Sequence, residues 1–168
     1  MRPLTRRLCF LNASLIVCAA GCASDGPKIT ATFNQGAALV GELPMNPLAW
    51  RVISSAIDPG SGTMSTLYGN DAAVTYARTH SQHDFPAGSA LSLVTWTQME
   101  DARWFGAKLP SQVKSVEFVT VTATQNGAPQ YSYEAYTGNP LKKAQDRPYG
   151  APPDRIAYLL SSPAAVMP

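Results

Sequence analysis

Two histidines have the type and spacing that could hold a metal ion. His80 and His83 are separated by two residues, and Asp84 follows directly. Two imidazoles and a carboxylate suit Zn²⁺, Cu²⁺ or Fe²⁺, and a spacing of three residues places both rings on one side of a helix. The alternative is a solvated helix end, where a cationic histidine complements the helix dipole. The spacing leaves both interpretations open.

Thiols are the second candidate group, and the chain has three cysteines, Cys9, Cys18 and Cys22. The first two lie in an N-terminal segment with three early arginines and an apolar run at 8–20, which is shorter than the roughly 20 residues of a bilayer span. Small residues at 19–21 precede Cys22, which resembles a bacterial lipobox. We therefore expect a lipoprotein signal peptide at 1–21, with an ordinary secretory signal as the alternative.

A lipobox implies that Cys22 is acylated and becomes the first residue of the mature chain. Its acyl chains would attach the domain to a membrane surface. Ala23 follows the cysteine, and by the common sorting rule of enteric bacteria this favours the outer membrane, with the domain in the periplasm. The expected partner is thus a membrane, reached through the lipid anchor.

The net charge excludes one class of partner. The formal charge is +2, but residues 1–21 contain three arginines and no acidic residue, so Lys and Arg fall from 13 to 10 against 11 acidic residues, a balance of −1. Such a balance lacks the positive footprint of a nucleic-acid-binding protein. We expect no nucleic acid partner.

The elements that must position these groups follow from hydrophobic patterning. Residues 22–47 are rich in Gly, Pro, Thr and Asn, which predicts a flexible tether with one short strand at 38–42. Residues 48–168 form the expected domain. Strands are predicted at 50–57, 63–68, 90–96, 113–124 and 130–137, and helices at 70–79 and 153–161. This order predicts an α+β fold with an antiparallel sheet of about five strands and helices packed on one face.

Carboxylates offer a weaker signal than the histidines. Glu100 and Asp101 are adjacent in a segment, 98–110, that we expect to be irregular, and Glu117 lies within a predicted strand. An acid and base pair needs a defined separation and a buried setting, neither of which the sequence provides. We expect these three residues to be solvated, in a loop and at a strand edge.

Several ordered motifs resemble the cytochrome P-460 family between residues 50 and 136. They are Leu67-Tyr68-Gly69-Asn70-Asp71-Ala72-Ala73, Phe85-Pro86-Ala87-Gly88-Ser89-Ala90-Leu91, Val94-Thr95-Trp96 and Trp104-Phe105-Gly106-Ala107. Known members are periplasmic c-type haem proteins with an antiparallel sheet and packed helices. Some oxidise hydroxylamine, and relatives bind nitric oxide. The resemblance implies this fold, and a dimer is compatible with it.

The haem chemistry of the family does not transfer with the fold. Attachment of c-type haem requires two thiols and a histidine in a C-x-x-C-H motif. In the family this motif lies where this chain has residues 138–155, which contain neither cysteine nor histidine. The lysine that cross-links haem in hydroxylamine-oxidising members corresponds to Leu93. We expect no covalent haem and no hydroxylamine oxidation by that route.

Three functions therefore remain open at the level of sequence. The first is a noncatalytic binding module for a small apolar ligand, a haem or another envelope protein. The second is a redox or gas-binding protein, an oxidoreductase if it is an enzyme, that holds noncovalent haem through His80 or His83. The third is a metalloprotein at the same two histidines. The resemblance places five aromatic residues around the family's haem pocket, where they could line a cavity or fill one: Tyr68, Tyr76, Trp96, Trp104 and Phe105.

Overall fold

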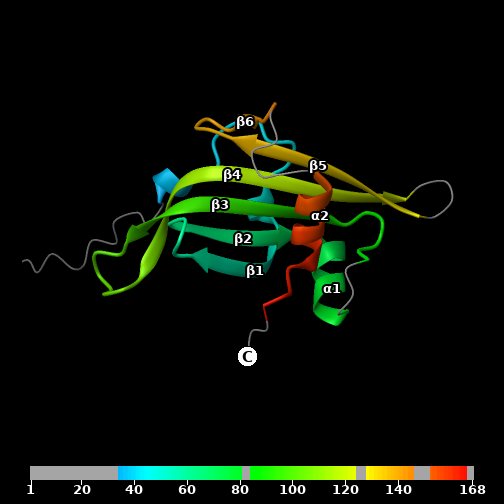
Figure 1. Cartoon of the computed structure of the whole chain (residues 1–168), viewed down its shortest axis with the longest axis horizontal. Helices are drawn as coiled ribbons and strands as arrows, with labels where there is room; N and C mark the ends of the chain where they lie inside the picture. The colour runs from blue at the N-terminus through cyan, green and yellow to red at the C-terminus, as the bar shows by residue number, and fades with distance from the viewer. Residues whose placement is uncertain (1–33, 81–83, 124–127, 146–151, 166–168) are drawn as a thin grey trace, which may run out of the picture. The chain divides into compact units, whose positions relative to one another are not determined.

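A single antiparallel sheet organises the chain. The computed structural model describes residues 34–80, 84–123, 128–145 and 152–165. Within them six strands lie in the sheet in chain order (Figure 1). The strands are β1 (Arg51–Asp58), β2 (Thr63–Gly69), β3 (Ala90–Glu100), β4 (Lys108–Ala123), β5 (Pro129–Thr137) and β6 (Lys142–Lys143). The helices are α1 (Asp71–Thr79) and α2 (Pro152–Ser161), with the short 3-10 helices η1 (Gln35–Ala37) and η2 (Pro47–Ala49).

The predicted fold class is confirmed as an antiparallel sheet with two helices, but the number of strands is six. The extra strand, β6, contains two residues that pair with Tyr136 and Thr137 of β5. Its segment has no alternating apolar pattern, so nothing in the sequence marks it as a strand. Among the described residues, neither helix has the length and apolar character needed to cross a membrane.

The predicted start of the first helix, at residue 70, is confirmed. Asn70 is the N-cap residue, and its Oδ1 accepts hydrogen bonds from the backbone N–H of Ala73 at 3.0 Å and of Ala90 at 3.2 Å. One amide oxygen thus caps the helix and connects it to the first residue of β3. This explains how the loop before β3 is held against the sheet.

The segment 98–110, expected to be irregular, is largely a hairpin. β3 continues to Glu100, and β4 begins at Lys108, with Gln98 opposite Pro110 and Glu100 opposite Lys108. Pro110 lies within β4, where the β3–β4 ladder has register shifts beside it, and proline is tolerated at such irregular positions. The two strands consequently extend beyond the rest of the sheet (Figure 1).

Both faces of the sheet are covered. We call the face packed against α1 and α2 the helical face, and the opposite one the outer face. The helical face buries Leu91, Leu93 and Val119 of the sheet with Val74 of α1 and Leu159 of α2. The outer face buries a second cluster, built from Val94, Trp96, Val116, Phe118, Tyr136 and Leu141. Because both faces are buried, the central strands β3 and β4 are apolar on both sides.

Residues 34–47, expected to belong to a flexible tether, pack instead across the outer face. Ala37, Leu39, Leu43 and Met45 contact the buried cluster there. These residues recur at every second position, apart from a glycine at 41, which is the spacing of an extended segment with one buried side. The expected strand at 38–42 reduces to one bridge between Gly41 and Leu141. Cys22 and the rest of 1–33 lie outside the described residues.

Candidate functional site

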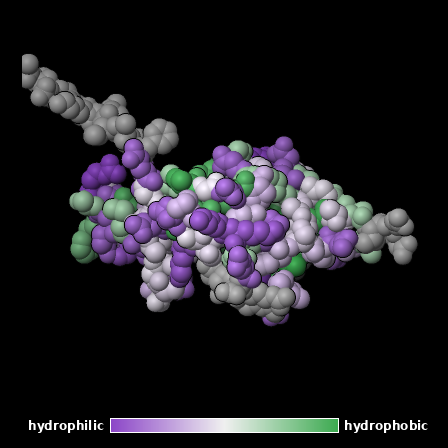
Figure 2. Space-filling view, turned by 90° about the horizontal axis from the view of Figure 1, so that it is seen from above, coloured by the Kyte–Doolittle hydropathy of each residue, from purple (hydrophilic) through white to green (hydrophobic). Residues whose placement is uncertain are grey.

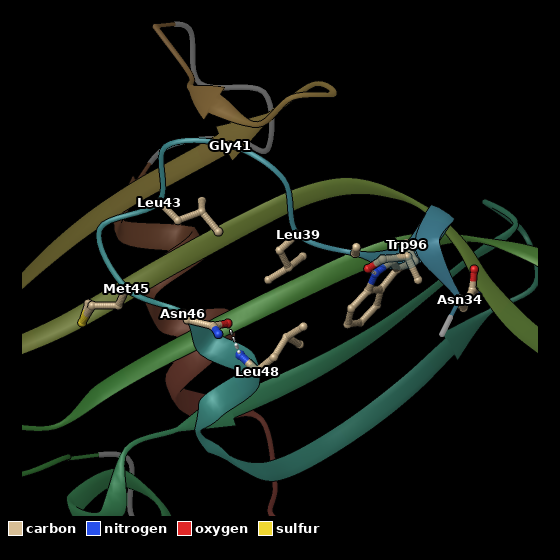
Figure 3. Close-up of a pocket in the computed structure, with 10 residues that line it drawn as sticks. Asn34, Leu39, Gly41, Leu43, Met45, Asn46, Leu48 and Trp96 are labelled. Carbon is tan, nitrogen blue, oxygen red and sulfur yellow. Dashed lines mark hydrogen bonds between the residues drawn. The ribbon is translucent and has the colours of Figure 1, made fainter. Parts of the chain in front are cut away.

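The outer face carries a groove between the 34–48 segment and the sheet. We call it the outer groove, and its volume is about 680 Å³. Figure 3 shows Leu39, Leu43, Leu48 and Trp96 converging on this space from the segment and from β3. The lining residues are Asn34, Ala37, Ala38, Leu39, Gly41, Leu43, Met45, Asn46, Leu48 and Trp96. This volume falls within the usual range for small-molecule sites.

Trp96 fixes one wall of the outer groove. The side chain is only 6% exposed, and its indole Nε1–H donates a hydrogen bond of 2.9 Å to the carbonyl oxygen of Ala37. A buried indole needs such a partner, because an unsatisfied N–H would carry a desolvation cost. The same bond ties the end of η1 to β3. Trp96 therefore both lines the outer groove and holds the 34–48 segment, which we call the cover of the groove, against the sheet.

Gly41 holds the middle of the cover. Its φ is +149°, and its backbone lies against Leu141, whose N–H donates to the Val40 oxygen at 2.7 Å. A Cβ at position 41 would lie 2.2 Å from the Leu141 carbonyl oxygen, so only glycine fits this approach. At the end of the cover, the Asn46 side chain accepts a 3.1 Å hydrogen bond from the Leu48 N–H at the start of η2.

The chemistry of the outer groove is that of an apolar binding site. Its walls are aliphatic and aromatic, and its polar side-chain groups are the neutral amides of Asn34 and Asn46 and the indole N–H of Trp96, which is bonded to Ala37. No described residue that lines it carries a charged or titratable carboxylate, amine or imidazole group. Such a lining can exclude water from an apolar molecule and orient it through an amide, but it offers no acid or base for proton transfer.

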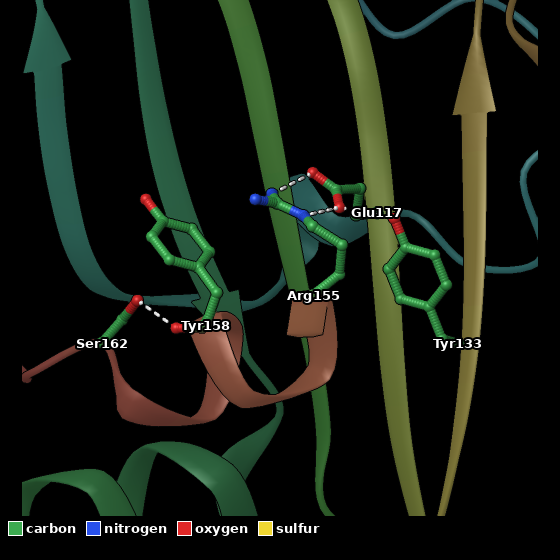
Figure 4. A network of polar contacts seen from close by, with 5 residues as sticks. All are labelled: Glu117, Tyr133, Arg155, Tyr158 and Ser162. Atoms are coloured by element: carbon green, nitrogen blue, oxygen red, sulfur yellow. Dashed lines mark hydrogen bonds and ion pairs between the residues drawn. The ribbon is translucent and has the colours of Figure 1, made fainter. Parts of the chain in front are cut away.

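The helical face holds a buried polar network. Glu117 on β4 is 1% exposed and accepts two hydrogen bonds from Arg155 on α2, from Nε at 2.9 Å and from Nη2 at 2.8 Å (Figure 4). The Tyr133 hydroxyl on β5 donates a third, at 2.6 Å. The expectation of a solvated Glu117 is therefore wrong, because β4 is a central strand and this position faces the helices.

In this network the Arg155 guanidinium and the Tyr133 hydroxyl face the carboxylate of Glu117. Burial raises the pKa of Tyr133, and the hydrogen bond to Glu117 raises it further. Burial alone would lower the pKa of Arg155, but the hydrogen bond and charge of Glu117 raise it above its usual value. The guanidinium also lies 4.6 Å from the centre of the Tyr158 ring. Glu117 is therefore enclosed by hydrogen-bond donors from α2 and β5 and acts as a structural group.

His80 lies at the end of α1 and is exposed. Its Nδ1 is 2.7 Å from the Thr79 hydroxyl oxygen, and its ring stacks on Tyr76 with 4.3 Å between ring centres. His83 lies outside the described residues, so the metal site at His80 and His83 stays a prediction. Within the described ranges, no group of three or more His, Cys, Asp or Glu residues could hold a metal ion.

The structure does not bring the five predicted pocket aromatics together. Tyr68 and Trp96 belong to the outer face, whereas Tyr76 packs against the buried cluster of the helical face. Trp104 and Phe105 are 70% and 110% exposed in the β3–β4 hairpin. The reason is that the five residues belong to different elements: two lie on strands with a common face, one lies on a helix across the sheet, and two lie at the tip of the hairpin. Of the five, only Trp96 lines the outer groove.

Sequence reasoning missed both the groove and the Arg155 pairing. The period-two spacing of Ala37, Leu39, Leu43 and Met45 was a usable signal for a segment lying on a surface. The pairing of Arg155 with Glu117 joins residues 38 positions apart on a helix and a strand. Single-sequence patterning contains no information about such a contact.

Comparison with known proteins gives one positive result. The family model described as Cytochrome P-460 matches residues 48–151. A search of curated proteins gives no match. The matched span contains β1 to β6 and α1, whereas most of the groove cover and Arg155 lie outside it.

Proposed function

Because the chain belongs to the cytochrome P-460 family, a family of haem-binding proteins, we propose that it is a membrane-anchored periplasmic lipoprotein that binds a small apolar ligand in the outer groove. On this proposal it is noncatalytic and holds no covalent haem. The observation that carries the binding function is the outer groove itself, with its aliphatic and indole walls and its volume of about 680 Å³.

The residues present do not fit a covalently attached haem. The three cysteines all lie at or before position 22, and none belongs to a C-x-x-C-H motif. On the helical face, the space between β4 and α2 is occupied by the Glu117 and Arg155 side chains. In the outer groove, the one side chain that could ligate iron among the described lining residues is the thioether of Met45. We therefore assign no chemical step to haem.

Family membership keeps noncovalent haem as the second candidate. The chain has two imidazoles, His80 and His83, and they are the expected axial ligands on that alternative. A protein purified after expression with haem supply would then show a Soret band that His80→Ala or His83→Ala removes. A colourless protein would favour the apolar-ligand function.

Attachment to the membrane rests on the lipobox-like residues before Cys22. Acyl chains on this cysteine would keep the domain at the membrane, since each buried methylene contributes ~0.8 kcal/mol. Replacing Cys22 with Ser should release the chain from the membrane fraction, and mass spectrometry of the native chain should show an acylated N-terminal cysteine. A native chain with an unmodified thiol at this position would contradict the proposed attachment to the membrane.

Ligand binding is tested with a neutral fluorescent probe, N-phenyl-1-naphthylamine, added to the full chain. We expect its emission to rise on binding, and Leu39→Gln and Leu43→Gln to weaken binding about tenfold each, the effect of losing roughly 1.5 kcal/mol of apolar contact. Val40→Gln is the matched control, because Val40 is exposed in the same segment and does not line the groove. Equal binding by the unmodified chain and all three variants would show that the probe binds outside the outer groove.

A further inference from the structure

The tip of the β3–β4 hairpin, residues 101–107, presents two aromatic side chains to solvent. Trp104 is 70% exposed and its neighbour Phe105 is 110% exposed. Figure 2 shows hydrophobic atoms among hydrophilic ones at this end of the domain, on the left of the view. Two adjacent aromatic side chains that the described residues leave this exposed indicate a contact with something outside the fold.

The tip has a defined conformation that directs these side chains outward. The backbone N–H of Asp101 donates to the Ala107 oxygen at 3.0 Å, and the Ala107 N–H donates to the Trp104 oxygen at 3.0 Å. The Asp101 side chain accepts from the Arg103 N–H at 2.8 Å, and Gly106 supplies the positive φ of +78° that the turn requires. Aromatic residues held in this way lose little conformational entropy when they bind.

The charges of the tip are paired with one another. Arg103 forms an ion pair with Asp101, and Lys108 forms one with Glu100 across the base of the hairpin. The tip therefore carries no net charge, which lowers the cost of bringing it into a less polar environment. The long side chains of arginine and lysine can keep their charged ends in water while their stems lie against an apolar phase.

The described chain begins beside this hairpin. The Asn34 side-chain amide donates to the carbonyl oxygen of Pro110 in β4, and η1 lies against the same strand. η1 and the hairpin lie at the same end of the domain in Figure 1. Cys22 precedes Asn34 by 12 residues, which can span at most about 40 Å. An anchor at Cys22 would therefore keep this end of the domain near the bilayer.

We propose that the 101–107 tip is a membrane contact, in which Trp104 and Phe105 insert at the boundary between the lipid headgroups and the acyl chains. The partner is the surface of a phospholipid bilayer, and the inference rests on the proposed attachment through Cys22. Tryptophan favours this boundary because its ring is apolar and its N–H is polar. The contact would fix the orientation of the domain on the membrane, with the hairpin directed toward it.

The test uses vesicles to which the protein is attached independently of cellular acylation. The full chain carries Cys9→Ser and Cys18→Ser, so that Cys22 is its single thiol, and it is coupled to a maleimide lipid in phosphatidylcholine vesicles. The vesicles contain phosphatidylcholine with brominated acyl chains, which quench tryptophan on contact. We expect quenching that Trp104→Phe abolishes and Phe105→Ser reduces. Val52→Thr should leave it unchanged, because Val52 is an exposed residue at the end of β1 that lies away from the hairpin.

Two results would overturn the membrane contact. One is the absence of quenching, or equal quenching in Trp104→Phe, which would show that the tip does not reach the acyl chains. The other is concentration-dependent burial of Trp104 in the uncoupled protein without vesicles, which would assign the tip to contact between two copies. A native chain without acyl groups on Cys22 would contradict the proposed anchor alone, because the coupled protein tests the tip separately.

Discussion

Arg155 on α2 and Glu117 on β4 form a two-point ion pair, with hydrogen bonds of 2.8 and 2.9 Å, in the layer between the sheet and the helices. The arginine is 20% exposed at its side chain and the glutamate 1%. The pair connects the last helix to the centre of the sheet.

Loss of either partner should therefore destabilise the fold. Arg155→Leu leaves a buried carboxylate with only the Tyr133 donor, and we expect a loss of about 3 kcal/mol in the free energy of unfolding. The double variant with Glu117→Leu should recover most of this loss, because it removes the unpaired charge. Urea denaturation of the full chain measures both. Arg51→Leu, which breaks the exposed pair with Asp71, serves as the control and should change stability by less than about 1 kcal/mol.

The phenol of Tyr136 should remain protonated far into the alkaline range. Burial and, to a smaller extent, the hydrogen bond to Glu134 together raise its pKa from 10.0 to about 12. The native state thus holds the proton more tightly than the unfolded state. The resulting stabilisation is complete below pH 10 and is lost as the pH rises toward 12.

Ultraviolet titration of tyrosinate checks this expectation. The native chain should show an ionisation step near pH 12 that Tyr136→Phe removes, whereas Tyr158→Phe on the exposed side of α2 leaves it in place. Complete ionisation of Tyr136 near pH 10 in the folded protein would contradict the burial of its hydroxyl group.

At the acidic end, Glu134 should contribute to stability. The hydrogen bond from Lys143 lowers its pKa below 4.5, and the bond from Tyr136 lowers it further. A carboxyl with a lowered pKa stabilises the fold above its unfolded pKa, and this contribution is lost as the pH falls through the native pKa. In the Glu134→Gln variant, the decrease in stability below pH 4.5 should therefore be smaller than in the unmodified chain. An unchanged acid profile measured by thermal unfolding would show that the pair with Lys143 is too solvated to contribute.

Gly41 should be required for the cover of the outer groove. Gly41→Ala brings a Cβ to 2.2 Å from the Leu141 oxygen, so the segment must move away from the sheet. Gly62→Ala is the matched control, because Gly62 also has a positive φ of 62° but no atom within 4 Å of the added Cβ. We expect a cost of about 1 kcal/mol at Gly62 and a larger one at Gly41. Only Gly41→Ala should weaken binding of N-phenyl-1-naphthylamine.

No haem should remain with the polypeptide after denaturation. Covalent attachment through thioethers requires a cysteine pair, which residues 23–168 do not contain. Acid and acetone extraction of protein expressed with haem supply should leave the chain colourless. Pigment that stays with the polypeptide would indicate a link through another side chain and would contradict the proposal.

The sequence predicted most of the sheet and α1 because local signals agree there. Asn70 is a strong cap, and β4 has alternating residues on both sides of a central strand, so propensity and burial point the same way. β6 and the extended β3–β4 hairpin were missed because pairing with a neighbour, rather than local pattern, makes them strands.

The candidate site was less accessible from sequence. The outer groove depends on how the 34–48 segment lies over β3, and this is set by long-range contacts such as that between Trp96 and Ala37. The predicted aromatics were placed around one pocket by the family resemblance, whereas in the structure they lie on strands, on a helix and at a hairpin tip. Family resemblance supplied the fold, but the groove cover and Arg155 lie mostly outside the matched span.

The most direct test of ligand binding in the outer groove is the methyl spectrum of the methionines during titration with N-phenyl-1-naphthylamine. Of the five methionines, Met45 lines the groove, Met64 packs on the same face without lining it, and Met99 is exposed near the hairpin. The proposal predicts that the Met45 methyl signal of the full chain shifts with saturation while those of Met64 and Met99 stay in place. A saturable shift at Met99 with none at Met45 would contradict it.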